Sequence, residues 1–301
     1  VLLYYYYYEL ITVNQTISSP RIMYAIRTAS HFYYKRLHYL METWISLVSD
    51  DVYFVTDSLP SNITTIKADH IQLTKDCPDQ SHSMSSLCCK TAHSFLLYHR
   101  FEHKYEWFCH FDDDNYVNSK NLKNYLSKLN SSIPYYIGRN SWNTSLNRRK
   151  NPFPVSFWFA TLGAGICLSS KLLQLLKPYT TSIQHFTSGC VRENYFDDIY
   201  LGFLINNFLN ITLTKNEQFH SHLEEKLFTK ENFMENLTRQ ITLGFRYPDR
   251  IPKFLPLLFP DDRWRIKLVH CLLFPNKTVC QKAKIRYLVN SFNLTMNKIS
   301  S

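Results

Sequence analysis

Residues 107–118 read WFCHFDDDNYVN, and this stretch carries the strongest indication of the fold. Residues 107–111 form an apolar run that predicts a short buried strand, and three consecutive aspartates follow it. In open α/β sheets, ligands bind at the carboxyl ends of the strands, where these carboxylates would lie. Adjacent aspartates also suit a solvated acidic turn or a helix N-cap, but the aromatic flanks favour a packed site. Hard carboxylate oxygens then predict Mg²⁺ or Mn²⁺ bound together with a diphosphate.

Strand and helix patterns alternate on both sides of this stretch. We predict further strands at residues 21–28, 52–56, 135–138, 157–162 and 211–214, and a short one within 65–73. Helices are predicted at residues 31–48, 84–101, 169–176 and 196–208, and from 118 or 119 to 129, and Pro178 is expected to end the helix at 169–176. This alternation predicts an α/β fold in which helices flank a mostly parallel sheet.

The composition excludes some classes of protein. The chain has 301 residues, of which 45% are apolar and 16% aromatic, so a disordered or low-complexity protein is excluded. The net charge of +10 suits an anionic partner such as nucleic acid, a phosphorylated ligand or a membrane surface. No run of five or more like charges occurs, which weakens the nucleic-acid alternative.

Glycosylation motifs and cysteines indicate the compartment. Acceptor motifs of the form N-x-[S/T] lie at Asn14, Asn62, Asn130, Asn143, Asn210, Asn236, Asn276 and Asn293, whereas chance predicts about 3 to 4. The chain also has 8 cysteines, and Cys271 and Cys280 flank a short turn that a disulfide would close easily. We therefore expect folding in an oxidising secretory lumen, which conflicts with nucleic-acid binding.

The N-terminal residues Val1–Tyr8 (VLLYYYYY) are apolar and aromatic. They are too few to cross a bilayer, which needs ~20 apolar residues. We interpret them as the luminal end of a signal-anchor helix, with tyrosines at the membrane interface. The alternative is an ordinary β-prone leader at the edge of the fold.

Three further segments carry candidate functional residues. In FWFATLGAGIC (157–167), Gly163 and Gly165 lie between a predicted strand and a predicted helix, which indicates close approach of a ligand or a plain tight turn. In FDDIYLG (196–202), an aspartate pair begins a helix and offers either a general base or a helix cap. In FHSHLE (219–224), His220 and His222 would point to opposite faces of a strand, so only one of them could join a shared metal site.

These segments, taken in this order, resemble the Fringe family of β1,3-N-acetylglucosaminyltransferases. The motifs RLHYLMETWIS (36–46) and HCLLFPNKTVC (270–280) add to the likeness, which runs from about Arg21 to Cys280. The family implies an inverting glycosyltransferase of GT-A fold. It also implies one catalytic domain at 21–281, the end of a signal-anchor and stem at 1–20, and a C-terminal tail at 282–301.

The resemblance implies a role for each matching residue. Asp114 and His222 resemble the ligands of Mn²⁺, Asp113 and Arg36 resemble residues that contact the UDP-sugar, and Asp198 resembles the catalytic base. The implied reaction is transfer of GlcNAc from UDP-GlcNAc to O-linked fucose on EGF-like repeats, as on Notch-type receptors. The implied location is the Golgi membrane, as a single-pass type II protein with a luminal catalytic domain and no nucleic-acid partner. Alternatives are a related β1,3-galactosyl- or glucosyltransferase that uses another UDP-sugar, and a non-catalytic lectin-like or scaffold relative.

The family also implies disulfides. The implied pairs are Cys109 with Cys167, Cys271 with Cys280, and Cys77 with Cys89 or Cys88, while Cys190 and the remaining cysteine bond to each other or stay free. Three positions depart from the family pattern. Leu162 replaces a glycine, Phe196 replaces a proline, and an expected donor-contacting arginine falls on Phe153 or Pro154. These departures leave the donor sugar open.

Overall fold

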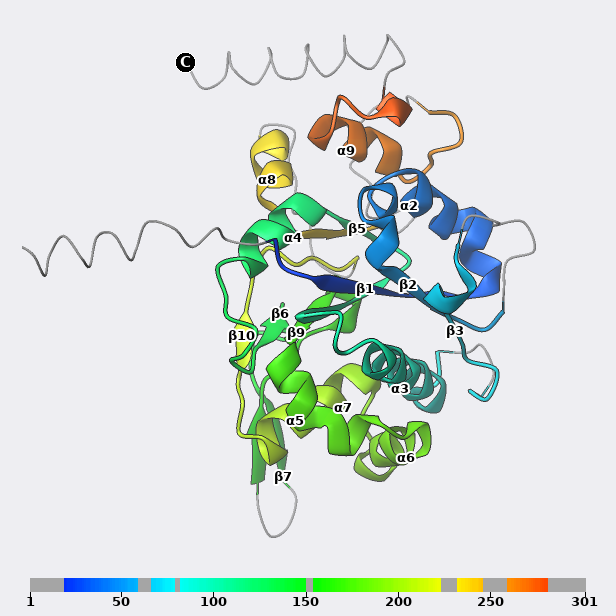
Figure 1. Ribbon diagram of the computed structural model, residues 1–301. Coiled ribbons are helices and arrows are strands. Elements are labelled where there is room, and N and C mark those ends of the chain that lie inside the picture. Colours follow the sequence, from blue (N-terminus) through cyan, green and yellow to red (C-terminus); the bar gives the residue numbers. More distant parts are fainter. Residues whose placement is uncertain are drawn as a thin grey trace, which may run out of the picture.

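The computed structural model describes residues 19–58, 66–78, 82–149, 154–222, 232–245 and 259–280. Its central feature is a seven-stranded sheet with the strand order β10-β6-β9-β4-β1-β2-β3 (Figure 1). The strands are β1 (Ile22–Arg27), β2 (Val52–Thr56), β3 (Ile71–Leu73), β4 (Trp107–Asp112), β6 (Tyr136–Gly138), β9 (Ile166–Ser169) and β10 (Leu213–Lys215). Only β9 runs antiparallel to its neighbours, β4 and β6, and the other adjacent strands of this sheet are parallel. The predicted α/β fold with a mostly parallel sheet is confirmed.

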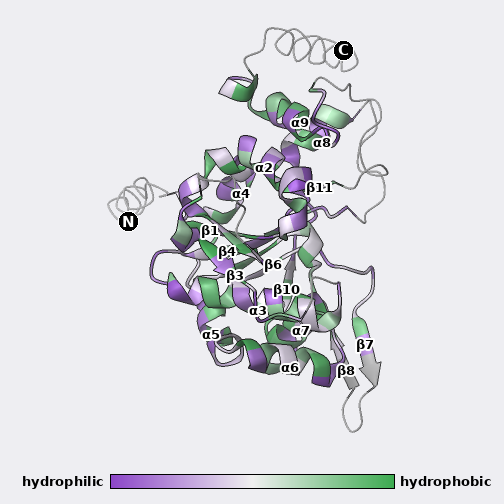
Figure 2. Ribbon diagram, turned by 90° about the vertical axis from the view of Figure 1, so that its right-hand side faces the viewer, coloured by the Kyte–Doolittle hydropathy of each residue, from purple (hydrophilic) through white to green (hydrophobic). Residues whose placement is uncertain are grey.

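Helices cover both faces of the sheet. On β1, Ile22, Tyr24 and Ile26 belong to one core, whereas Met23 and Ala25 belong to the other, because successive side chains of a strand point to opposite faces. Figure 2 shows the strands between two helical layers. One layer holds α2 (His38–Glu42), α4 (Ser119–Leu126), α8 (Phe233–Arg239) and α9 (Ile266–Leu273). The other holds α3 (Met84–Arg100), α5 (Ser170–Thr180), α6 (Ile183–Glu193) and α7 (Asp197–Phe203).

The segment predicted as one helix over 31–48 is broken into short pieces. It contains the 3₁₀ turns Ser30–Phe32 and Ile45–Leu47, the π-helical turn Tyr33–Leu37, and α2. The hydroxyl of Thr43 donates to the carbonyl of Tyr39, and the backbone of Thr43 leaves the helical region at φ −116° and ψ −112°. A side chain that bonds back to the preceding turn competes with the helical ladder, so the long helix ends here.

The prediction of a strand at 157–162 is also wrong. Strand β8 (Pro154–Phe157) ends at Phe157 and pairs with β7 (Leu146–Arg149) outside the main sheet. A 3₁₀ turn, Leu162–Ala164, follows, and β9 enters the sheet only after it. Gly163 and Gly165 therefore precede a strand and not a helix.

Helix α5 continues past Pro178, which we predicted to end it. Pro178 lacks the N–H that would bond to the carbonyl of Gln174, but Gln174 is exposed, so water can satisfy that carbonyl.

Four disulfides link the described residues: Cys77–Cys89, Cys88–Cys190, Cys109–Cys167 and Cys271–Cys280. The three implied pairs are confirmed, and the open alternatives are resolved in favour of Cys89 for Cys77 and of Cys88 for Cys190. This number of disulfides indicates folding in an oxidising compartment. The acceptor asparagines Asn130, Asn143, Asn210 and Asn276 are exposed, and Asn236 is half-buried on α8.

Some sequence predictions fall outside the described residues. These are the anchor at Val1–Tyr8, the tail at 282–301, the acceptor sites Asn14, Asn62 and Asn293, and Phe153. Within the described ranges, no helix is both long and apolar enough to cross a membrane.

Candidate active site

The three aspartates lie at the carboxyl end of β4, as the sequence predicts. A tight turn after Asp112 leads into a short strand, β5 (Asn115–Val117). The side chain of Asn115 holds this turn, because its Oδ1 accepts from the N–H of Asp112 at 3.2 Å. Its Nδ2 donates to the carbonyl of Gly163 at 3.0 Å. Asp113 and Asp114 are therefore fixed beside the carboxyl end of the parallel strand β1.

Arg36 contacts both of these aspartates. Its Nη1 lies 2.9 Å from Oδ1 of Asp113 and 3.7 Å from Oδ2 of Asp114. The hydroxyl of Thr28 donates to the other oxygen of Asp113 at 2.7 Å. The Arg36 guanidinium also lies over the ring of Phe32, 3.8 Å from its centroid. Asp113 is only 4% exposed, and burial raises its pKa to about 6 although Arg36 acts in the opposite direction.

Asp114 and His222 form a pair that is suited to a cation. His222 Nδ1 lies 3.1 Å from Oδ2 of Asp114. Nevertheless, this nitrogen and Oδ1 of Asp114 are buried without a hydrogen-bond partner among the described residues. Unpartnered buried polar atoms are rare in folded proteins. Two such atoms on neighbouring side chains, one carboxylate and one imidazole, fit the ligands of a divalent ion.

The second histidine of this segment has a different environment. His220 is buried, and its Nε2 lies 2.8 Å from Oε1 of Gln240. The prediction that only one of the two histidines can join a metal site agrees with this arrangement. The reason differs from the one we gave, because residues 219–222 are not in a strand.

A glycine brings His222 into place. Strand β11 (Thr242–Gly244) pairs antiparallel with β5, and Gly244 lies opposite Asn115. A β-carbon on Gly244 would lie 2.2 Å from the backbone nitrogen of His222, so only glycine allows this approach. The N–H of Phe245 donates to the carbonyl of Asp114 at 2.9 Å. Strand β11 and the residue that follows it thus support both members of the pair.

Arg27 links the aspartate turn to the second acidic pair. Its Nε lies 2.9 Å from Oδ1 of Asp112, and its Nη1 lies 2.6 Å from Oδ2 of Asp197. The hydroxyl of Thr91 donates to the same oxygen of Asp197 at 2.7 Å. Asp197 and Asp198 begin α7, so this network positions Asp198 relative to the aspartate turn.

The two aspartates of α7 have different environments. Asp197 is bound by Arg27 and Thr91, whereas Oδ1 of Asp198 accepts from the N–H of Ile199 at 2.8 Å. Burial, and then the charge of Asp197, raise the pKa of Asp198 to about 7. A carboxylate with a pKa near the working pH is suited to act as a general base.

Several residues of this site were not singled out in the sequence. Arg27 lies next to the last residue of the strand predicted at 21–28, so the rule that ligands bind at carboxyl ends could have found it. Gly244 gave no signal, because its contact with His222 depends on tertiary structure. At Gly165, φ is +85°, and a β-carbon there would lie 2.6 Å from the ring of Phe111. The tight-turn interpretation is therefore right for Gly165, and close approach of a ligand is not needed to explain that glycine.

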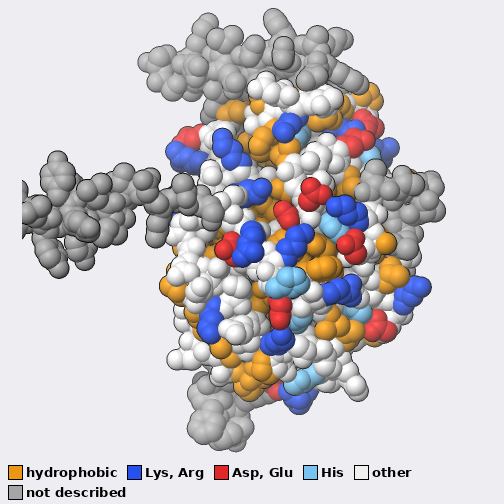
Figure 3. All heavy atoms as spheres, in the orientation of Figure 1, with side chains coloured by type: hydrophobic (Ala, Val, Ile, Leu, Met, Phe, Trp, Pro, Cys, Tyr) orange, Lys and Arg blue, Asp and Glu red, His pale blue; other side chains and the backbone are white. Residues whose placement is uncertain are grey.

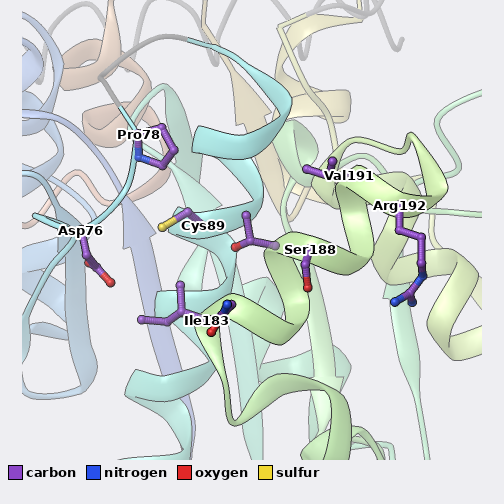
Figure 4. Close-up of a pocket in the computed structure, with 9 residues that line it drawn as sticks. Asp76, Pro78, Cys89, Ile183, Ser188, Val191 and Arg192 are labelled. Atoms are coloured by element: carbon purple, nitrogen blue, oxygen red, sulfur yellow. The ribbon is translucent and has the colours of Figure 1, made fainter.

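The face of the molecule in Figure 3 shows no separation of positive from negative side chains among the described residues. Lys and Arg side chains are interspersed with Asp and Glu over the face in Figure 3. A pocket of about 620 Å³ lies between α3, α6 and the segment before α3 (Figure 4). Its lining includes Asp76, Cys89 and Val191, and the candidate residues described above are not part of it.

Comparison with known proteins identifies the family. The model of the family described as Fringe-like matches residues 17–277. This chain belongs to the Fringe-like family. The lunatic fringe β-1,3-N-acetylglucosaminyltransferase of Danio rerio is 32% identical over 88% of this chain and 71% of that protein. The radical fringe β-1,3-N-acetylglucosaminyltransferase of Gallus gallus is 31% identical over 91% and 74%, respectively.

A fly protein gives a similar match to this member of the Fringe-like family. The Fringe glycosyltransferase of Drosophila melanogaster is 30% identical over 86% of this chain and 63% of that protein. Membership of the family makes this chain a glycosyltransferase. Among solved structures, a glycosyltransferase involved in glycosylation of the major capsid of PBCV-1 is 14% identical, with a TM-score of 0.39 over 75% of this chain and 94% of that one. That structural likeness is too weak to indicate a function.

Proposed function

We propose that this Fringe-family chain transfers GlcNAc from UDP-GlcNAc to O-linked fucose on EGF-like repeats of Notch-type receptors, with inversion at the anomeric carbon. The observation that supports this most directly is the contact among Arg36, Asp113, Asp114 and His222 at the carboxyl ends of β1 and β4. The family relatives whose names include β-1,3-N-acetylglucosaminyltransferase support the sugar and the linkage.

Asp114 and His222 would hold Mn²⁺, because their buried oxygen and nitrogen have no other partner in the described part of the chain. When bound, this ion neutralises the charge that develops on the leaving diphosphate. Arg36 and Asp113 bind the donor beside it, and the contact between them keeps both side chains in place before the donor arrives.

Asp198 acts on the acceptor. In its ionised form it removes the proton from the fucose hydroxyl, and that oxygen then attacks the anomeric carbon from the side opposite the diphosphate. The bond from this carbon to the diphosphate oxygen breaks, and UDP leaves with the electron pair. General-base assistance of this kind contributes about 10²- to 10⁴-fold to the rate. Arg27 keeps Asp197 paired, so Asp198 is the member of the acidic pair that remains for the acceptor.

A related β1,3-galactosyl- or glucosyltransferase is the second candidate. Two substitutions against the family pattern favour it: Leu162 is buried in the turn before β9, and Phe196 is 42% exposed directly before the acidic pair. Both lie near segments that approach the sugar in the proposed arrangement, so they are the residues to examine if the donor is not UDP-GlcNAc.

We propose a Golgi location, with a type II anchor before a luminal catalytic domain at 21–281. The four disulfides and the exposed acceptor asparagines support a secretory lumen.

The test is a transfer assay with an O-fucosylated EGF repeat and UDP-GlcNAc, UDP-galactose or UDP-glucose. Product should form from UDP-GlcNAc, should require Mn²⁺ and should disappear when EDTA is added. Asp114→Asn should abolish it, whereas Asp69→Asn, which changes an exposed aspartate, should not. Transfer of galactose or glucose instead would select the second candidate, and metal-independent transfer would contradict the proposed ligands.

A further inference from the structure

Lys90 on α3 is a buried lysine that has no partner among the residues that the structure describes. The residue is 7% exposed, and its ammonium has neither a hydrogen bond nor an ion pair with any described residue. Buried lysines are normally paired, since burial of an uncompensated charge is costly. Lys267 shows the usual arrangement, with Glu42 and Asp261 each 2.6 Å from its ammonium.

The charges around Lys90 belong to the candidate active site. Asp57, Asp113 and Asp112 attract its ammonium, and Arg27 repels it. Each of these carboxylates already accepts hydrogen bonds from other groups. Burial lowers the pKa of Lys90, and the nearby carboxylates act in the opposite direction. The chain therefore keeps a costly cation next to the donor-contacting residues.

The position of Lys90 indicates what it binds. The next residue, Thr91, donates to Asp197, the neighbour of the proposed base Asp198. The charge of Asp113, which we assign to the donor, also acts on the ammonium of Lys90. In any transfer reaction, the migrating sugar lies between the leaving diphosphate and the base-activated acceptor. We propose that Lys90 is a donor-binding residue whose ammonium donates a hydrogen bond to a hydroxyl of the transferred sugar.

This inference rests on the proposed function and adds to it a residue that recognises the sugar part of the donor. A lysine that bound the diphosphate would contribute to binding of UDP as well as of the UDP-sugar. A lysine that binds the sugar contributes only to the UDP-sugar. The two ligands therefore distinguish the two roles.

The experiment measures binding of UDP and of UDP-GlcNAc by calorimetry in the presence of Mn²⁺, for the wild type, Lys90→Met and Lys90→Gln. We expect UDP affinity to stay within about twofold and UDP-GlcNAc affinity to fall about 10- to 100-fold, which corresponds to loss of a hydrogen bond from a charged donor. Because no residue in the described ranges pairs with the Lys90 ammonium, the Tm of Lys90→Met should equal or exceed that of the wild type.

Ser94→Ala is the matched control, since Ser94 is buried one turn later on α3 and donates to the carbonyl of Lys90. It should leave both affinities unchanged. The proposal would be overturned if the Lys90 variants bound UDP and UDP-GlcNAc equally weakly, or if they bound both as tightly as the wild type does. A fall in Tm together with loss of binding of both ligands would also overturn it. The wild type is first titrated with UDP-GlcNAc, UDP-galactose and UDP-glucose, and the variants are compared on the sugar that binds. This titration shows whether UDP-GlcNAc is the donor independently of the role of Lys90. A wild type that binds none of the three UDP-sugars would overturn both proposals.

Discussion

The raised pKa of Asp198 predicts a pH dependence of the transfer rate. Burial and the charge of Asp197 raise this pKa from 3.8 to about 7. Only the ionised carboxylate can accept the proton of the acceptor hydroxyl. Activity should therefore be lost as the pH falls through about 7, and not near 4 as for an ordinary aspartate.

The size of the effect follows from the ionised fraction. With a pKa of about 7, roughly one tenth of Asp198 is ionised at pH 6 and roughly nine tenths at pH 8. We expect kcat/KM to rise about tenfold over this range, because kcat/KM reports the free enzyme. Asp198→Asn should lower kcat by about 10²- to 10⁴-fold and should leave no rise between pH 6 and pH 8.

The assay is transfer to an O-fucosylated EGF repeat at fixed Mn²⁺, with UDP binding measured at each pH. Asp113, which we assign to the donor, has a pKa of about 6 and would also titrate in this range. The binding control shows whether that titration changes donor binding, so it can be separated from titration of the base. A wild-type profile that is flat between pH 6 and pH 8 while UDP binding stays constant would show that Asp198 is not the base.

The same pKa shift has a consequence for stability. The folded protein holds the proton of Asp198 more tightly than the unfolded chain does, so stability is lost as the pH rises from about 4 through 7. The Tm of Asp198→Asn should therefore exceed that of the wild type most clearly at pH 8. Thermal melts at pH 5 and pH 8 check this, and a lower Tm for the variant at pH 8 would contradict it.

Two other predictions concern the residues that support the site. Arg27→Met leaves the buried carboxylate of Asp197 and the half-buried one of Asp112 without their cation, and it should lower the free energy of unfolding by about 3–5 kcal/mol in denaturant titrations. An effect below about 1 kcal/mol would mean that this network does not stabilise the fold. Gly244→Ala pushes a β-carbon into the backbone of His222 and should weaken Mn²⁺ binding, measured by calorimetry, at least about tenfold, and His222→Ala should do the same. Gly163→Ala is the control, since a β-carbon there makes only ordinary contacts of 3.8 Å or more; equal effects of the two glycine variants would refute the role of Gly244.

The elements with strong local signals were predicted well. The run VYFVT gave strand β2 with its observed bounds, since β-branched and aromatic residues suit a buried strand. Helix α3 was predicted within one residue, because its apolar spacing is regular and the Ser83 side chain caps its first turn. The aspartate turn was also placed correctly at the end of β4, where its position depends on the preceding apolar strand.

The misplaced elements depend on distant contacts. The turn before β9 is decided by Phe111, which packs against Gly165, and the sequence around the turn does not contain that information. Strands β5 and β11 have three residues each and pair across more than 120 positions of chain, so neither has a periodic pattern long enough to detect. Motifs in the sequence were enough to predict roles for single residues. The contacts made by Arg27 and Gly244 join segments that are distant in the sequence, so they were not predicted.

Disulfides from two adjacent cysteines attach α3 to two different segments of the chain. Cys89 joins it to the segment after β3, and Cys88 joins it to α6. Two covalent bonds on neighbouring residues prevent the helix from sliding or turning about its axis, whatever binds next to it. The position of α3, which carries Lys90 and Thr91, is therefore fixed. Adjustment to substrates of different shape has to come from the opposite helical layer, where the chain between β1 and β2 consists of short, interrupted turns.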